Sequence, residues 1–260
     1  MLAGVGWISA AMGRALLEDD RVTALGLHVE GVGDLRAFEA LAAEARARGK
    51  PVVALKAGRS EHARAAAVSH TASLSGSDAG ARALLRRLGI AQVHSLTALL
   101  ETLKLLHFAG PLPSGRIASM SCSGGEASLM ADTALDRALS FPPLDAAQQS
   151  ALRAALGPKV ALANPLDYHT YIWDDAPAMG RTFAAMLSGD VALGCLIVDF
   201  PRPDRCSMTA WDCAIEASAS AARETGKPMA LIATLPEGLP ESIAGRCVEA
   251  GLVPLHGLDD

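Results

Sequence analysis

Short apolar runs alternate along this chain with longer segments in which apolar residues recur every three or four positions. The short runs are typical of buried strands, and the longer segments are typical of amphipathic helices. The predicted strands span residues 23–29, 51–56, 116–121, 191–199, 228–234 and 253–257. The predicted helices span residues 35–48, 79–89, 95–108, 126–137, 145–156, 176–187, 208–224 and 240–250. This alternation predicts an α/β protein whose parallel sheets are covered by helices on both faces.

Helix-breaking residues are densest between Ala109 and Gly115, so this segment is the best candidate for a linker. We therefore expect two flavodoxin-like domains, at residues 1–109 and 115–260. The first domain offers only two or three predicted strands, which is fewer than such a sheet normally has. We expect this domain to be truncated at its N-terminus, in a chain that is either a fragment or a subunit completed by others.

The composition narrows the class of protein. Hydrophobic residues make up 50% of the chain, which is enough to fill two cores. A net charge of −5 without a basic run argues against a nucleic-acid-binding protein. The 5 scattered cysteines contain no Cys-x-x-Cys pair, and they fit a reducing cytoplasm better than a disulfide framework or a zinc site. No apolar stretch reaches the ~20 residues that a membrane helix requires, so we expect no membrane partner.

The segment from Ser69 to Asp78 carries the strongest chemical signal. It presents His70 among small residues, between a predicted strand and a predicted helix. Ser75 and Asp78 have the spacing of a capping box, and the N–H groups and dipole of a helix start favour an anion. A neutral imidazole is a nucleophile near neutral pH, so we predict that His70 is phosphorylated during turnover. The simpler alternative is a solvated loop histidine.

A second turn of small residues, Ser123-Gly124-Gly125, follows the predicted strand at 116–121. It is either a tight turn with a helix cap or a second phosphate contact. The next residue, Glu126, suits the dipole of a helix start but competes with a bound anion, which weakens the second interpretation.

Six motifs, taken in order, resemble those of the NDP-forming acyl-CoA synthetases. These enzymes are relatives of succinyl-CoA synthetase and are typified by ADP-forming acetyl-CoA synthetase. The motifs are Glu30-Gly31, residues 50–60, Ser69-His70-Thr71, Gly76-Ser77-Asp78, residues 121–125 and Asn164-Pro165-Leu166-Asp167. The complete enzymes of that family have a CoA-binding Rossmann domain, two succinyl-CoA synthetase-like flavodoxin domains and an ATP-grasp domain. This chain resembles only the two middle domains.

The resemblance implies a role for each matched residue. His70 stands where the family has its phosphorylated histidine, and Glu30 stands where the family has a glutamate bonded to that histidine. A carboxylate on one ring nitrogen fixes the tautomer and steadies a phosphorylated ring. The residues that the resemblance places against phosphate at two helix starts are Ser75, Gly76, Ser123, Gly124 and Gly125. At Glu126 the chain departs from the small residue or proline that is frequent in the family.

The implied reaction runs in three steps. ATP, with Mg²⁺, phosphorylates His70 at a distant ATP-grasp site, and the His70 loop then swings to deliver the phosphoryl group to a carboxylic acid. CoA attacks the resulting acyl phosphate and forms acyl-CoA. The implied partners are the missing CoA-binding and ATP-grasp domains or subunits, within a homo- or hetero-oligomer. The isolated segment is expected to bind no cofactor and to be inactive alone.

The segment after Asn164-Pro165-Leu166-Asp167 bears on the choice of acid. The Asn-Pro pair predicts a turn, and residues 168–173 contain 3 aromatic side chains. They form either a hydrophobic plug at the domain interface or the wall of an acyl pocket. A pocket wall suits a hydroxycinnamate such as ferulate better than acetate or another short-chain acid, and some members of the family are feruloyl-CoA synthetases. The candidate substrate-binding residues are Asn164, Asp167 and His169.

A different class of function remains open. Similar pairs of flavodoxin-like domains occur as non-catalytic, ligand-sensing halves fused to lysine acetyltransferases. The histidine is typically lost in those proteins, so the presence of Glu30 together with Ser69-His70-Thr71 favours the enzyme.

Overall fold

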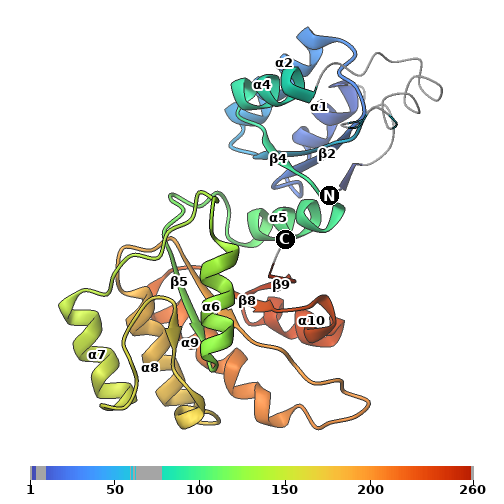
Figure 1. Ribbon diagram of the computed structural model, residues 1–260. Helices are drawn as coiled ribbons and strands as arrows, with labels where there is room; N and C mark the ends of the chain where they lie inside the picture. The colour runs from blue at the N-terminus through green and yellow to red at the C-terminus, as the bar shows by residue number, and fades with distance from the viewer. Residues whose placement is uncertain (1, 4–9, 59, 61, 63–77, 259–260) are drawn as a thin grey trace. The chain divides into compact units, whose positions relative to one another are not determined.

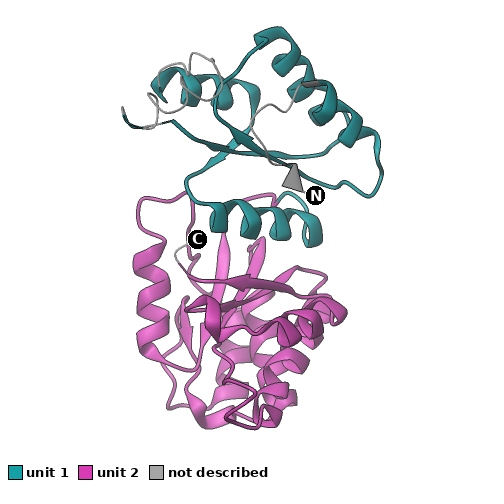
Figure 2. Cartoon of the chain, turned by 90° about the vertical axis from the view of Figure 1, so that its right-hand side faces the viewer, with its two compact units in different colours: residues 1–111 teal, residues 112–260 magenta. Residues whose placement is uncertain are grey.

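The computed structural model describes residues 2–3, 10–58, 60, 62 and 78–258. The chain forms two compact units, residues 1–111 and residues 112–260, coloured teal and magenta in Figure 2. The boundary falls inside the segment 109–115 that the sequence marks as a linker. We describe each unit by itself.

Unit 1 contains a parallel sheet of four strands in the order β1-β2-β3-β4. The strands are β1 (Leu2–Ala3), β2 (Leu25–Val29), β3 (Val52–Lys56) and β4 (Ala91–Val93). The expectation of two or three strands is therefore wrong. Strands β1 and β4 have two and three residues, which is too short for an apolar pattern to identify.

The helices of unit 1 cover both faces of this sheet. They are α1 (Ala10–Glu18), α2 (Leu35–Ala47), α4 (Asp78–Leu88) and α5 (Leu96–Phe108). One core joins α1, α2 and α4 to β2 and β3, and it includes Leu17, Leu41 and Leu85. Leu99 and Leu103 of α5 pack with Val53 against the opposite face. Unit 1 is thus a three-layer α/β structure, as Figure 1 shows.

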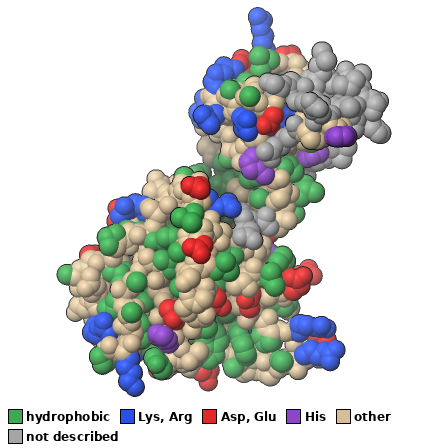
Figure 3. Space-filling model, in the orientation of Figure 1, with side chains coloured by type: hydrophobic (Ala, Val, Ile, Leu, Met, Phe, Trp, Pro, Cys, Tyr) green, Lys and Arg blue, Asp and Glu red, His purple; other side chains and the backbone are tan. Residues whose placement is uncertain are grey.

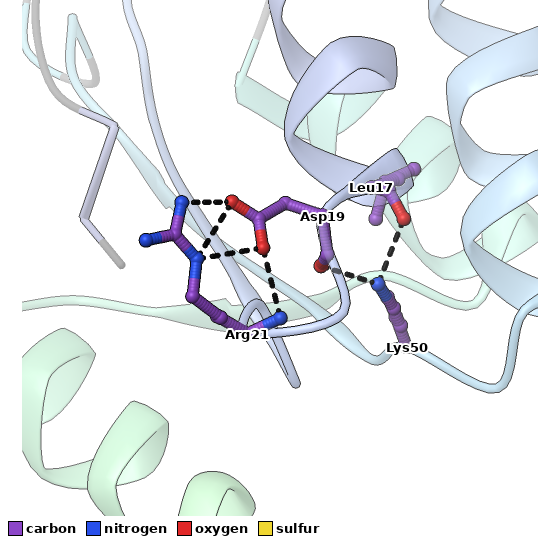
Figure 4. A network of polar contacts seen from close by, with 4 residues as sticks. All are labelled: Leu17, Asp19, Arg21 and Lys50. Atoms are coloured by element: carbon purple, nitrogen blue, oxygen red, sulfur yellow. Dashed lines mark hydrogen bonds and ion pairs between the residues drawn. The ribbon is translucent and has the colours of Figure 1, made fainter.

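A polar network fixes the turn between α1 and β2 (Figure 4). The Lys50 ammonium donates to the carbonyl oxygens of Leu17 and Asp19, at 2.7 and 2.8 Å. The guanidinium of Arg21 binds both oxygens of the Asp19 carboxylate and lowers the pKa of that group to about 2. Lys50, the first residue of a motif that resembles the synthetases, therefore holds the C-terminal end of α1, where helix carbonyls lack partners.

Unit 2 contains a parallel sheet of five strands in the order β6-β5-β7-β8-β9. The strands are β5 (Ile117–Ser121), β6 (Leu166–Asp167), β7 (Leu193–Ile197), β8 (Met229–Ala233) and β9 (Val253–His256). The helices are α6 (Gly124–Thr133), α7 (Ala146–Leu156), α8 (Ala176–Leu187), α9 (Asp212–Thr225) and α10 (Glu241–Glu249). Every residue of β5, β7 and β8 is buried, as expected for parallel strands covered on both faces.

Most predicted elements of unit 2 are found, with two shifts at helix starts. The predicted helix at 126–137 begins earlier, at Gly124, and ends at Thr133. The predicted helix at 208–224 divides into a 3₁₀ turn, Thr209–Trp211, and α9. The sequence pattern did not identify β6, which has two residues and follows a cis peptide bond between Asn164 and Pro165.

The strand order of unit 2 creates a special position at the carboxyl end of β5. The chain leaves β5 to form β6 on one side of it and then returns to form β7 on the other side. In open parallel sheets, ligands bind outside the carboxyl ends of the strands at such a reversal of strand order. Helix α6 starts there, so the Ser123-Gly124-Gly125 turn lies at this edge (Figure 1).

Two properties of the described residues concern the surface. None of their helices is long and apolar enough to cross a membrane. On the face shown in Figure 3, the Lys and Arg side chains of the described residues lie in separate small groups among neutral, acidic and hydrophobic ones.

Candidate functional site

The start of α6 is open. Ser123 is the N-cap residue in extended conformation, yet its side chain makes no capping hydrogen bond. The spacing Ser123-x-x-Glu126 is that of a capping box, in which the two side chains would bind each other's backbone N–H groups. Neither side chain does so among the described residues. The first N–H groups of α6, which have no partner inside the helix, therefore remain available to an anion.

Gly124 keeps a carboxylate close to this helix start. A Cβ atom at residue 124 would lie 3.2 Å from Oδ2 of Asp167, which is tighter than ordinary contact. A Cβ at Gly125 would meet Ser123 Oγ at 3.5 Å, which is an ordinary distance. The first glycine thus allows Asp167, at the end of β6, to lie beside the start of α6, whereas the second is not required for space.

Three carboxylates gather at the carboxyl ends of β5, β6 and β7. Glu126 lies in the first turn of α6, Asp167 ends β6, and Asp199 follows β7. Burial, followed by the charges of Asp199 and Asp167 in that order, raises the pKa of Glu126 to about 7. Oε2 of Glu126 is buried without a hydrogen-bond partner among the described residues. Asp199, by contrast, accepts hydrogen bonds from the N–H and the hydroxyl of Thr234, at 2.9 and 2.6 Å.

Two further groups border the carboxylates. Burial raises the pKa of the Cys122 thiol, and the charges of Glu126 and Asp167 add to that effect, so this thiol is no thiolate nucleophile at neutral pH. Tyr168 is 0% exposed, and its hydroxyl has no partner among the described residues. Burial raises the pKa of this phenol, and the charges of Cys122, Glu126 and Asp167 contribute.

The aromatic residues at 168–173 do not share one environment. Tyr168 belongs to the core of unit 2, where its ring packs edge-on against Phe183 at 5.5 Å. Tyr171 is 65% exposed. Trp173 packs edge-on against Trp211 at 5.9 Å. Within unit 2 these side chains therefore do not line up as a single wall.

The predicted substrate residues after the Asn-Pro turn have different roles. The Asn164 amide accepts from the N–H of Ser119 and donates to the carbonyl oxygens of Ile117 and Pro142, so it holds the edge of β5. Oδ1 of Asp167 accepts from the N–H of His169 at 2.9 Å, while the His169 ring lies 3.7 Å from Oδ2.

The backbone of His169 is strained. Its φ of 57° and ψ of −179° place it in a region that is almost restricted to glycine. Such strain persists only where surrounding contacts enforce it, and it occurs preferentially at functional sites. The hydrogen bond from His169 N–H to Asp167 and the one from Tyr168 N–H to Ser121 O, at 2.9 Å, enforce it here.

In unit 1 the predicted site is described in part. His70, Ser75 and Gly76 lie outside the described residues. Glu30 follows β2 and is half-buried, and it lies at the same edge of the sheet as Lys56, which ends β3. In the sequence, His70 lies between β3, which ends at Lys56, and α4, which begins at Asp78.

Lys56 is a candidate that the sequence analysis did not single out. It is only 5% exposed, and its ammonium donates to the carbonyl oxygen of Glu30 at 2.8 Å and to that of Ala57. Burial lowers the pKa of Lys56, whereas the carboxylates of Asp78 and Glu30 act in the opposite direction. The available signal was a lysine at the end of an apolar strand, because buried lysines are rare unless they have partners.

The amino-acid sequence of this chain is similar to those of known proteins. Residues 9–106 match the family model of the succinyl-CoA ligase like flavodoxin domain. The chain is 37% identical over 145 residues to the alpha subunit of acetate–CoA ligase [ADP-forming] II from Pyrococcus furiosus. This alignment covers 55% of this chain and 31% of the relative. It is 29% identical over 189 residues to a trans-feruloyl-CoA synthase from an unknown prokaryotic organism, covering 73% of this chain and 27% of that relative.

A solved structure shows the same fold over nearly the whole chain. The dinucleotide forming acetyl-coenzyme A synthetase 1 of Ca. Korarchaeum cryptofilum, in complex with phosphate and ADP, superposes with a TM-score of 0.79 at 19% identity. The match covers 97% of this chain and 54% of that chain. The expected α/β fold, with parallel sheets flanked by helices as in flavodoxin-like domains, is confirmed.

The chain spans about a third or less of the curated relatives it matches, 31% and 21% for the first two. The second of these is an acetate–CoA ligase [ADP-forming] from Methanocaldococcus jannaschii, 30% identical over 151 residues, or 58% of this chain. The resemblance drawn from the motifs is thereby confirmed. Residues 9–106 thus match a succinyl-CoA ligase like flavodoxin domain, and 55% of the chain is similar in sequence to an ADP-forming acetate–CoA ligase subunit.

Proposed function

We propose that this chain supplies two flavodoxin-like domains of an ADP-forming acyl-CoA synthetase that transfers a phosphoryl group through His70. The observation that supports this most directly is the combination of Ser69-His70-Thr71 with Glu30 in a relative of ADP-forming acetate–CoA ligases. Lys56 adds physical support, because it places a buried positive charge beside Glu30, at the end of the strand that precedes His70 in the sequence. Such a charge favours a phosphorylated imidazole nearby.

The proposed reaction has three steps, and in each of them one bond forms as another breaks. A ring nitrogen of His70 attacks the γ-phosphorus of ATP, the bond to the β-γ bridging oxygen breaks, and ADP leaves. A carboxylate oxygen of the acid then attacks the phosphorus, the P–N bond breaks, and neutral imidazole is restored as acyl phosphate forms. The CoA thiolate finally attacks the acyl carbon and expels phosphate. Positioning and charge neutralisation supply most of the catalysis in phosphoryl transfer.

The proposed site residues fall into two groups. In unit 1 these are His70 as the nucleophile, Glu30 as the residue that orients it, and Ser75 and Gly76 as phosphate contacts. In unit 2 the open start of α6 supports an anion-binding role for Ser123, Gly124 and Gly125. Asp167 and His169 remain candidates for contacting the acid, whereas the Asn164 amide is occupied by the backbone of β5.

The complete enzyme needs partners beyond this chain. We propose that ATP with Mg²⁺ and CoA bind to further domains or subunits, and we assign none of these ligands to a described residue. Among those residues no group of three His, Cys, Asp or Glu side chains is arranged to hold a metal ion. We place the reaction in the reducing cytoplasm, because the cysteines are scattered and include the buried Cys195 and Cys247.

We favour a short-chain acid over a hydroxycinnamate as the substrate. The case for an aromatic acid depends on a wall formed by residues 168–173. Within unit 2 these side chains diverge, with Tyr168 in the core and Tyr171 exposed. Relatives of both kinds exist, so a direct comparison of acetate and ferulate in a thioester assay decides this point.

Labelling with γ-³²P-ATP tests the central claim. The full-length protein should acquire an acid-labile, base-stable label, since phosphohistidine has this stability, and His70→Asn should abolish the label and reduce acyl-CoA formation at least ~10³-fold. His62→Asn is the matched control, because His62 is an exposed histidine of the same segment and should label normally. Labelling of His70→Asn would show that another residue carries the phosphoryl group, and no labelling of the wild type would favour the regulatory alternative.

A further inference from the structure

An ionised Glu126 would conflict with anion binding at the open start of α6. An ionised carboxylate in the first turn of α6 would repel the anion that the N–H groups there are free to bind. It would also lie with the carboxylates of Asp167 and Asp199, which act on it from β6 and from the end of β7. No cation partner of Glu126 is found among the described residues. Three ionised carboxylates close to one another at this helix start would repel both one another and a bound anion.

A proton on Glu126 removes this contradiction. The charges that act on Glu126 are those of Asp199 and Asp167, and Glu126 itself acts on Cys122 and Tyr168; none of these groups is cationic. Burial together with two like charges favours the neutral acid. A neutral carboxyl beside a helix start is a hydrogen-bond donor, so it adds to the N–H groups where an ionised one would oppose them.

The Tyr168 hydroxyl is a second observation that indicates a polar ligand near the start of α6. Its side chain is 0% exposed, and its hydroxyl has no partner among the described residues. Buried polar atoms are almost always satisfied in native proteins, by the chain or by something bound to it. The Tyr168 hydroxyl interacts with the charges of both Glu126 and Asp167, so the two unpartnered groups belong to one neighbourhood.

We propose that Glu126 carries a proton at neutral pH and donates it in a hydrogen bond to an oxyanion bound at the start of α6. The ligand class is the carboxylate of the acid substrate or the oxygen of its acyl phosphate, and to that extent the inference rests on the proposed function. Glu126 is then a pH-dependent binding residue of the anion site, and it stands where the sequence resemblance leads one to expect a small residue or proline. The proton stays on Glu126 throughout, so no bond is broken in this role.

Sulfate binding to the 260-residue chain tests the inference without requiring turnover. Sulfate keeps its charge between pH 5.5 and 8.5, so a change in its affinity reports the protein. At constant ionic strength, calorimetry should show sulfate bound about 30-fold more weakly at pH 8.5 than at pH 5.5. The reason is that the protonated fraction of a carboxyl whose pKa is about 7 falls by about that factor.

Three variants complete the experiment. Glu126→Gln keeps a neutral donor and should bind sulfate with an affinity that changes less than about twofold over this range. Glu249→Gln, an exposed glutamate on α10, is the matched control and should keep the pH dependence of the wild type. Asp199→Asn removes the carboxylate whose charge raises the pKa of Glu126 more than that of Asp167 does. This variant should therefore move the midpoint to lower pH. Carbon-13 NMR of the Glu126 carboxyl, identified by its absence in Glu126→Gln, should show the same midpoint as sulfate binding.

The outcomes separate this inference from the proposed function. Wild-type pH dependence in Glu126→Gln, tighter sulfate binding at high pH, or no sulfate binding at any pH would each overturn the role of Glu126. If the sulfate result is as expected but the full-length enzyme makes no acyl-CoA, the proposed reaction is wrong and the protonated anion site stands.

Discussion

The two units share one architecture but differ in the charge they place at the carboxyl edge of the sheet. Unit 1 buries a cation there, Lys56, whose ammonium binds two backbone carbonyls beside Glu30. Unit 2 gathers Glu126, Asp167 and Asp199 at the corresponding edge, with no buried cation among its described residues. The strand order also differs, because it runs β1-β2-β3-β4 in unit 1 and reverses at β5 in unit 2. The same kind of sheet can therefore carry a site with a buried lysine in one unit and a site with a protonated carboxyl in the other. The side chains at the strand ends make the difference.

The largest expected effect comes from removing the cation of unit 1. Lys56→Met keeps an apolar stem but leaves the carbonyls of Glu30 and Ala57 without their donor, so it should destabilise unit 1 by about 3 kcal/mol. Lys50→Met is the matched control, because Lys50 also donates to two carbonyls but is half-exposed, and it should cost about 1 kcal/mol. Hydrogen exchange of the β3 amides, with those of β8 as an internal reference, measures both.

Equal losses in the two lysine variants would mean that burial of Lys56 adds nothing to its hydrogen bonds. A loss of protection in β8 as large as that in β3 would mean that the two units do not unfold independently. Either result would remove the first half of the comparison.

A smaller effect is expected from the strained residue of unit 2. His169→Gly should stabilise unit 2 by about 1 kcal/mol, because glycine adopts the backbone conformation of residue 169 without strain. His169→Ala deletes the same ring but keeps a Cβ, so it should give no such gain. Urea unfolding followed through Trp173 and Trp211, in a Trp7→Phe background, reports on this unit. A gain in the alanine variant would attribute the effect to the ring and not to the backbone.

An effect of similar size is expected in the dependence of stability on pH. The folded pKa of Glu126, about 7, lies above its ordinary value of 4.5, so the folded state binds more protons between these values. Stability contributed by the neutral acid is therefore complete below the unfolded pKa, falls as pH rises from about 4.5, and is lost above about 7. Glu126 is only partly buried, so solvent screening reduces the expected loss to about 1 kcal/mol.

Glu126→Gln should remove this part of the pH profile, while Glu249→Gln should leave it unchanged. The measurement is the free energy of unfolding of unit 2 at a series of pH values. An unchanged slope in Glu126→Gln would show that Glu126 titrates at the same pH in the folded and unfolded chain, and the contrast between the two units would lose its second half.

The long elements were predictable because their patterns are local. Residues 176–187 form α8 as expected, since the apolar positions of this segment repeat with the period of a helix and Asp175 caps its start. Strands β1, β4 and β6 were missed because two or three residues are too few to show a period. Their pairing depends on neighbouring strands that are distant in the sequence.

The candidate site was predictable only in outline. The glycine turn at 123–125 and its helix start follow from residues that are adjacent in the chain. Asp199 could not be connected with Glu126, because the end of β7 lies beside β5, which leads into α6, only after the sheet forms. The motif lysines illustrate the same limit, since Lys50 holds the end of α1 and Lys56 is buried beside Glu30, although both occur in one short segment.

The sequence by itself determined the alternation of strands and helices and the family that its motifs resemble, because short-range periodicity and adjacent residue types encode these. Only the tertiary structure decided that the Ser123-x-x-Glu126 capping box stays open, that Tyr168 joins the core, and that Glu126 lies with two other carboxylates. These outcomes depend on which strands become neighbours, and burial and charge at a strand end take their values only from those neighbours.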